Sequence, residues 1–205
     1  MDDKLTDTSR ILYTLADGLD SINAKFAICG FRSGSSTSTS WDARDASIDN
    51  SQYHRLYETA MHDLFKGFEE RFKDIAWKLT NLKATGGTPM AEGLELALKA
   101  LSSRKEGHRV IFIVTDGQPD PSHAPVLRSQ IRRAREAGIQ LIAVGLGRGS
   151  EYVKKVFPDS VFAFHLGEIP PQLVTKLEEL VLEIGTSKRG KTVKELTPGI
   201  GKGFR

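Results

Sequence analysis

Apolar and polar positions in the first part of the chain follow periods that predict two helical regions and one strand. Leucine and isoleucine recur at helical spacing over residues 4–22, which predicts an amphipathic helix. The apolar run 25–31 predicts a strand, and the serine-rich stretch 32–51 predicts a loop. Apolar positions within 53–82 again follow helical spacing, so a long helix or a broken pair of helices is predicted there.

The second part of the chain alternates strands and helices. Residues 109–117 and 139–147 are continuous apolar runs, which are typical of strands buried on both faces. A further strand is predicted at 160–166, and helices are predicted at 90–103, 126–137, 151–157 and 170–184. This order predicts an α/β, Rossmann-like fold with a mainly parallel sheet and helices on both faces. Ligands of such sheets bind at the carboxyl ends of the strands.

Length and charge divide the chain into a domain at 1–184 and a tail at 185–205. A chain of 205 residues is long enough for one domain with an extension. The tail holds six basic residues and one acidic residue, so it carries a net charge of +5. Since the whole chain carries +3, residues 1–184 carry a net charge of −2. The basic, glycine-containing tail is predicted to be a disordered, solubilising extension rather than a contact for nucleic acid or an acidic partner.

Several features predict a cytoplasmic protein that does not associate with a membrane. No apolar run approaches the ~20 residues needed to cross a bilayer. The first ten residues are acidic and polar, unlike a signal peptide. The single cysteine, Cys29, lies in an apolar run and is predicted to be a small core residue in a reducing compartment.

Two short loops hold the residues with the clearest chemical potential. Asp116 follows the strand predicted at 109–117, where its carboxylate can bind a hard cation, act as a base, or cap the next turn. Thr88 lies in the sequence TGGTPM, in which Gly86 and Gly87 allow the backbone to approach a ligand closely. Its hydroxyl can also act as an ordinary N-cap of the following helix. Each loop alone is explained by turn chemistry.

Together, the two loops TGGTPM and VIFIVTDGQPD resemble those of von Willebrand factor A-type (VWA) domains. In that family they supply the second and third parts of a metal-ion-dependent adhesion site (MIDAS). The resemblance implies that Thr88 and Asp116 contact Mg²⁺ or Mn²⁺, while Gly86, Gly87 and Gly117 shape the loops. It implies a non-catalytic module for protein interaction.

Within the family, the chain looks most like the C-terminal domain of the cobaltochelatase CobT subunit and its phage and bacterial relatives. The segments GGTPMAEGLELAL, GIQLIAVGLG and VFPDSVFAFHLGEIPPQLV carry this resemblance. It implies an adaptor in cobalamin biosynthesis, or in a related complex, that works beside a hexameric AAA-type ATPase during insertion of a metal into a tetrapyrrole.

One family motif, Asp-x-Ser-x-Ser at the end of a central first strand, is missing from this sequence. Either the chain begins just after that motif, or the domain is divergent and never had the strand. Without this central strand, the strands predicted at 25–31 and 109–115 have unpaired backbone edges, at about 1–3 kcal/mol for each buried unpaired group. Either these neighbours close up, or another chain supplies a strand, or the protein aggregates. We expect poor solubility of the isolated chain, which gel filtration can measure; a monomer with a cooperative thermal transition would contradict this expectation.

The missing motif also limits the expected metal chemistry. Two ligands alone predict Mg²⁺ binding at about millimolar concentration or none. Asp2 and Asp3 could add oxygens, or could instead favour the helix N-terminus through its dipole. A weakly neutralised cation accepts a carboxylate from a partner, which favours binding over turnover. The rival predictions are a hydrolase or phosphoryl-transfer enzyme using Asp116 with Asp120, and a non-binding fragment from a misassigned start.

Overall fold

The apolar runs of the second half form a parallel sheet in the order β3-β4-β5. The computed structural model describes residues 2–34, 60–119, 123–147, 149–157, 159–163, 171 and 175. Its parallel strands are β3 (Arg109–Thr115), β4 (Ile139–Leu146) and β5 (Asp159–Ala163). This confirms the predicted α/β class with parallel strands and agrees closely with the runs on which the strands were predicted.

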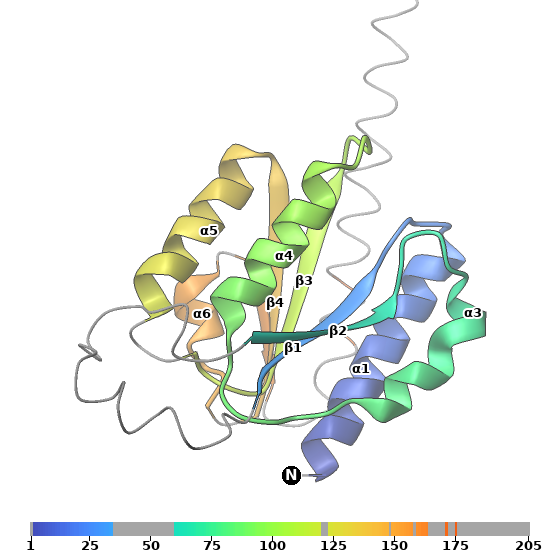
Figure 1. Ribbon diagram of the computed structural model, residues 1–205, viewed down its shortest axis with the longest axis horizontal. Coiled ribbons are helices and arrows are strands. Elements are labelled where there is room, and N and C mark those ends of the chain that lie inside the picture. The colour runs from blue at the N-terminus through green and yellow to red at the C-terminus, as the bar shows by residue number, and fades with distance from the viewer. Residues whose placement is uncertain are drawn as a thin grey trace, which may run out of the picture.

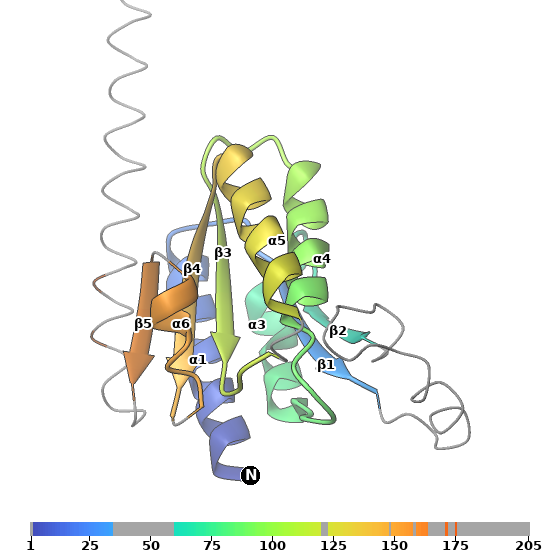
Figure 2. The same cartoon turned by 90° about the vertical axis from the view of Figure 1, so that its left-hand side faces the viewer.

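Helices cover both faces of the parallel sheet (Figures 1 and 2). On one face, α4 (Met90–Ser102), α5 (Ala124–Glu136) and the short α6 (Val153–Val156) pack on β3 and β4 in one apolar cluster. On the other face, α1 (Asp2–Ser21) places Ile11 against Val144, Leu146 and Val161. Because β4 is buried on both faces, its sequence is a continuous apolar run.

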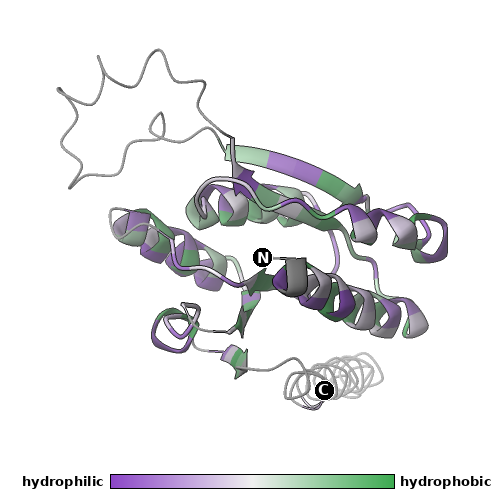
Figure 3. Ribbon diagram, turned by 90° about the horizontal axis from the view of Figure 1, so that it is seen from below, coloured by the Kyte–Doolittle hydropathy of each residue, from purple (hydrophilic) through white to green (hydrophobic). Residues whose placement is uncertain are grey.

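A separate antiparallel hairpin lies beside this sheet. It consists of β1 (Ile28–Ser33) and β2 (Ala60–Lys66). A short helix α3 (Phe72–Ile75) and a 3-10 helix η1 (Ala76–Asn81) follow it. Figure 3 shows α1 with both apolar (green) and polar (purple) segments along its length. The resulting second core contains Ala16, Phe26, Ile28, Phe65, Phe72, Ile75 and Leu79.

The long helix predicted within 53–82 is wrong, because residues 60–66 form strand β2 and only short helices follow. Leu64, which contributed to the helical spacing, is 69% exposed, whereas its neighbours Phe65 and Lys66 are buried. Pairing with β1 determines the conformation of residues 60–66, because the preference of a segment for a strand depends on the neighbours against which it packs. The buried Lys66 ammonium donates to the carbonyl oxygens of Phe26 (2.8 Å) and Gly67 (3.0 Å), and burial lowers its pKa.

The other predicted elements are confirmed with small shifts at their ends, except where they lie outside the described residues. The strand predicted at 25–31 begins at Ile28 and continues to Ser33. Most of the helix predicted at 170–184 lies outside the described residues, as does the tail 185–205; Pro171 and Thr175 are helical. None of the helices in the described part of the chain is long and apolar enough to cross a membrane.

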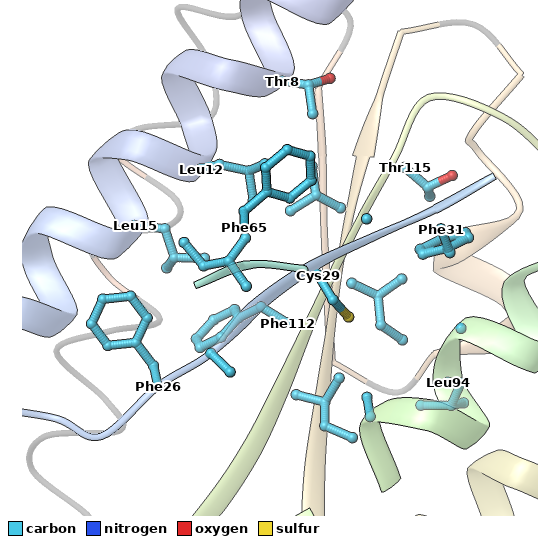
Figure 4. Close-up of a pocket in the computed structure, with 18 of the residues that line it drawn as sticks. Thr8, Leu12, Leu15, Phe26, Cys29, Phe31, Phe65, Leu94, Phe112 and Thr115 are labelled. Carbon is cyan, nitrogen blue, oxygen red and sulfur yellow. The ribbon is translucent and has the colours of Figure 1, made fainter. Parts of the chain in front are cut away.

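The hairpin and the parallel sheet are not joined by a strand in the described part of the chain, as the missing motif led us to expect. Among the described residues, β1 pairs with β2 and β3 pairs with β4, but β1 and β3 do not pair with each other. A cavity of about 570 Å³ separates them, lined by both strands, α1 and α4 (Figure 4). We refer to this cavity as the slot.

The slot overturns the prediction for Cys29. This residue was expected in the core, but it lies on β1 in the wall of the slot and is exposed to solvent (Figure 4). The protein around the thiol still raises its pKa through desolvation. The apolar run correctly indicates that Cys29 lies in a strand. The prediction of burial was wrong because burial of the strand also needs neighbours on both of its edges, and the described β1 pairs only with β2.

Candidate metal centre

The loops that carry Thr88 and Asp116 meet at the carboxyl edge of the parallel sheet. Asp116 follows the last residue of β3, and Thr88 lies two residues before the start of α4. A Cβ atom placed on Gly117 would lie 3.0 Å from the Thr88 hydroxyl oxygen, so this hydroxyl sits against the turn that begins at Asp116. Both residues line the same end of the slot. The structure therefore brings together the two loops singled out in the sequence.

Ser33, at the end of β1, holds the threonine loop in place. Its hydroxyl accepts a hydrogen bond from the Gly87 N–H, and its carbonyl accepts one from the Thr85 hydroxyl at 2.9 Å. Ser33 is only 2% exposed, so these contacts are shielded from water. Gly86, between the two contacts, has φ = 63°, a conformation that favours glycine. The loop shape thus depends on a buried serine from a different element.

Arg32 joins the same loop to the hairpin. Its Nε donates to Asp63 Oδ2 at 2.8 Å, and its Nη2 donates to the other carboxylate oxygen at 3.4 Å. Its Nη1 donates to the Thr85 hydroxyl at 3.0 Å. The hydrogen bond from Arg32 lowers the pKa of the Asp63 carboxyl, with a smaller opposing effect of desolvation. One guanidinium therefore links β1, β2 and the threonine loop.

Replacing Arg32 tests this link through the acid dependence of stability. In Arg32→Met we expect the Asp63 pKa to rise towards the ordinary value of about 3.9. A carboxyl group whose pKa is lower in the folded than in the unfolded chain stabilises the fold at pH values above the unfolded-state pKa. This stabilisation is lost as the pH falls through the folded-state pKa. The variant should therefore lose less stability than wild type on acidification below about pH 4. Carboxyl NMR titration and urea unfolding measure both effects; an unchanged Asp63 pKa would contradict the assigned contact.

The turn after β3 is braced by its own side chains. The Thr115 hydroxyl donates to the Gly117 carbonyl at 2.9 Å and accepts from the Gly117 N–H at 3.3 Å. Nearby, the Tyr152 hydroxyl lies 3.1 Å from the sulfur of Met90, and burial raises the Tyr152 pKa while a hydrogen bond with Thr115 opposes this. These contacts join the loop after β3 to the start of α4.

Asp116 has a charged neighbour at the mouth of the slot. The Lys4 ammonium from the first turns of α1 lies 3.8 Å from Asp116 Oδ2, and both side chains are half exposed. An exposed pair at this distance is weak, at about 0–1 kcal/mol. A cation bound by this carboxylate would be repelled by the nearby ammonium, so the two would compete.

The donors at this edge fit Mg²⁺ or Mn²⁺ in kind, because a hydroxyl and a carboxylate supply the oxygen ligands that hard cations prefer. No side-chain hydrogen bond caps the start of α4, whose N-cap is Pro89, so the capping alternative for Thr88 is wrong. The described residues contain no group of three or more His, Cys, Asp or Glu side chains suited to a metal. The side chains of Asp2 and Asp3, and the whole of Asp120, lie outside the described part.

Arg32 and Ser33 are the residues of this edge that the sequence analysis missed. The strand was predicted to end at Phe31, and the next two residues were assigned to a serine-rich loop. A usable signal was present, since Arg32 and Ser33 are polar residues that directly follow an apolar run. Asp116, which also follows an apolar run, had been identified in this way.

The fold and this edge define a Rossmann-like α/β domain with two polar loops that converge beside the sheet. Residues 57–157 match the family described as von Willebrand factor type A domain. A similar solved structure is that of proximal thread matrix protein 1 from the mussel byssus, with a TM-score of 0.57 and 12% identity. The alignment covers 82% of this chain and 40% of that protein. At this identity the likeness concerns the fold alone, and it agrees with a VWA-type architecture. No curated protein was found that matches the sequence.

Proposed function

We propose that this domain is a non-catalytic protein-interaction module that binds its partner through a divalent cation. The observation that carries the proposal is the position of the Thr88 hydroxyl against the turn that begins at Asp116. Both side chains lie at the carboxyl edge of the sheet, where ligands of parallel α/β folds bind. The match of 57–157 to the VWA family supports protein interaction as the general function.

The charge balance of the site favours binding over turnover. A Mg²⁺ or Mn²⁺ ion held by one carboxylate and one neutral hydroxyl keeps most of its positive charge and several exchangeable waters. An Asp or Glu side chain of a partner can replace a water and neutralise the ion further. Thr88 and Asp116 would hold the ion, while Ser33 and Arg32 position the threonine loop.

The partner that we propose is an AAA-type ATPase subunit, with this domain as a CobT-like adaptor in a cobalt-chelatase or related complex of the cytoplasm. The sequence resemblance around GGTPMAEGLELAL and TDGQPD supports this setting. Co-purification of such an ATPase with wild type, and its loss with Asp116→Asn, would support the assignment. Turnover of a phosphate ester or another substrate by the purified chain would favour the hydrolase alternative instead.

Calorimetric titration with MgCl₂ and MnCl₂ tests the metal site directly. We expect wild type to bind with a dissociation constant of about 1 mM. Asp116→Asn and Thr88→Val should each weaken binding by at least about tenfold, equivalent to 1.4 kcal/mol. Lys4→Met should strengthen it by up to about fivefold, since it removes the competing ammonium.

A matched control separates a specific site from general charge. Asp17 is an exposed carboxylate on α1, so Asp17→Asn makes the same change of charge and should leave the heats unaltered. Equal heats for wild type and Asp116→Asn would remove Asp116 from the site and overturn the proposal.

A further inference from the structure

Helix α5 carries four arginines, and three of them lie along one exposed side. At 3.6 residues per turn, Arg128, Arg132 and Arg135 fall within an arc of about 60°, because they are spaced four and three residues apart. All three residues are exposed, whereas Leu127 and Ile131 on another side of the helix are buried in the core. We refer to Arg128, Arg132 and Arg135 as the arginine stripe. It belongs to a helix at the outside of the domain, which faces the viewer in Figure 2.

The stability of α5 itself does not explain the stripe. Arginines four residues apart, such as Arg128 and Arg132, repel each other and destabilise a helix. The helix dipole favours acidic residues in the first turn and basic residues in the last turn. Arg135 lies in the last turn, but the first turn has no acidic residue. Arg128 lies in the second turn, where it gains nothing from the dipole.

The charge of the stripe is neutralised only in part by the described residues. The Nε of Arg132 lies 4.0 Å from Glu136 Oε1, and both side chains are largely exposed, so this ion pair is weak. Neither Arg128 nor Arg135 has an ion-pair partner within the part of the chain that the structure describes. Residues 1–184 carry a net charge of −2, so the stripe is a local concentration of positive charge on a weakly acidic domain.

The side-chain chemistry and the length of the stripe indicate what binds there. A guanidinium group binds a carboxylate through two parallel hydrogen bonds, a geometry that lysine cannot reproduce. The stripe extends over about 10 Å of helix axis. A second helix with carboxylates at i, i+4 and i+7 presents three negative charges over the same length. Nucleic acid also binds arginine, but its affinity comes from many phosphate contacts, which three guanidinium groups on an acidic domain do not supply.

The stripe starts near the edge that holds the candidate metal centre. Because α5 connects the parallel strands β3 and β4, it runs in the direction opposite to both strands (Figure 2). Its first residue, Ala124, therefore lies towards the carboxyl end of β3, where Asp116 is located. Of the three arginines, Arg128 is the nearest to this edge along the helix axis and Arg135 is the farthest. One partner can thus contact the edge and the stripe together.

We propose that the arginine stripe is a docking surface for an acidic helical segment of a partner protein, with carboxylates at i, i+4 and i+7. This inference rests on the interaction function proposed above and names the kind of partner, but it does not require the cation. The carboxylates of the partner accept hydrogen bonds from the three guanidinium groups. One of them replaces Glu136 beside Arg132.

The test uses the full chain and two synthetic peptides of the same composition. Each fluorescent peptide has about 16 residues, which is long enough for partial helix formation in an alanine-rich sequence. The aligned peptide has glutamates at i, i+4 and i+7. The isomeric peptide has them at i, i+5 and i+6, which places them on three different sides of the helix. Anisotropy measures binding at low ionic strength, where surface charges are least screened, and all samples contain EDTA.

Two matched variants separate the stripe from general charge. The stripe variant combines Arg128→Gln, Arg132→Gln and Arg135→Gln. The control variant makes the same change of charge at three exposed lysines on other elements and loops, namely Lys73→Gln, Lys83→Gln and Lys105→Gln.

We expect the stripe variant to bind the aligned peptide at least about tenfold more weakly than wild type does, because three ion pairs are lost. The control variant should change the affinity by less than about threefold. Wild type should bind the aligned peptide at least about threefold more tightly than the isomeric peptide, since the isomer can pair with only part of the stripe.

Three outcomes would overturn the proposal. The first is equal affinity of wild type for the two peptides, or no binding of either, and this outcome does not depend on how any variant folds. The second is equal binding of the aligned peptide by wild type and the stripe variant. The third is tighter binding of a DNA duplex of matched length, lost in the stripe variant, which would assign the stripe to nucleic acid. Because EDTA is present, these results are independent of the metal titrations that test Thr88 and Asp116.

Discussion

Gly86→Ala is expected to lower the stability of the domain by about 2–4 kcal/mol. A Cβ atom on residue 86 would lie 2.1 Å from the Ser33 hydroxyl oxygen and 2.9 Å from its carbonyl oxygen. Ser33 is buried and bonded to both Thr85 and Gly87, so it has little freedom to move. The alanine would also adopt φ near 63°, which L-residues disfavour. Thermal unfolding should show the loss as a decrease of roughly 5–15 °C in Tm.

Two other glycines separate the sources of this effect. Gly138 has a similar φ of 65° but open space around it, so Gly138→Ala measures backbone strain alone, at about 1–2 kcal/mol. Gly107 also has open space and no positive φ, and Gly107→Ala should be close to neutral. If Gly86→Ala lowers the free energy of unfolding no more than Gly138→Ala does, the contact with Ser33 does not constrain the loop. A displaced loop should also weaken Mg²⁺ binding at temperatures where the variant is folded.

The parallel sheet was predictable from the sequence because its signal is local. Strands buried on both faces, such as β3 and β4, are continuous apolar runs, and the helices between them end at clear positions. Gly138, for example, closes α5 with a positive φ. Strand β2 lacked such a signal, because its burial depends on β1, a partner separated by the stretch 34–59. A hairpin of that length has no short turn that would reveal it.

The candidate site divides in the same way. Thr88 and Asp116 could be identified because each lies in a glycine-containing loop next to a strong apolar element. Ser33 and Arg32 act through contacts with Gly87, Thr85 and Asp63 across the fold. Neither contact follows from spacing along the chain, because it requires the threonine loop to lie beside the end of β1. The exposure of Cys29 has the same origin, since pairing of β1 on its second edge is a property of the assembled sheet.

Helix α1 contributes to both sides of the open slot, since it packs on the parallel sheet through Ile11 and on the hairpin core through Ala16. Phe72 is a vulnerable point of its packing in the hairpin core. Phe72 is 2% exposed and packs against Tyr13 of α1, with ring centroids 5.4 Å apart, and against Phe26, at 6.1 Å. Removing a buried phenylalanine costs about 3–5 kcal/mol. Total stability is about 5–15 kcal/mol, so Phe72→Ala should remove a large fraction of it. Trp77→Ala, at a side chain that is 63% exposed, is the control and should change stability little.

The loss from Phe72→Ala should be unevenly distributed, because β1 and β3 share no backbone ladder in the described chain. The cluster around Phe72 holds α1, the hairpin and α3, whereas the parallel sheet has its own cluster with α4 and α5. Amide exchange should therefore accelerate in β1 and β2 while β3 and β4 keep most of their protection. Contacts between the halves limit this separation, among them Gly93 on α4 with the Phe31 ring and Ser33 of β1 with the threonine loop. If amide exchange accelerates equally in all strands, these contacts and α1 couple the two cores into one cooperative unit despite the open slot.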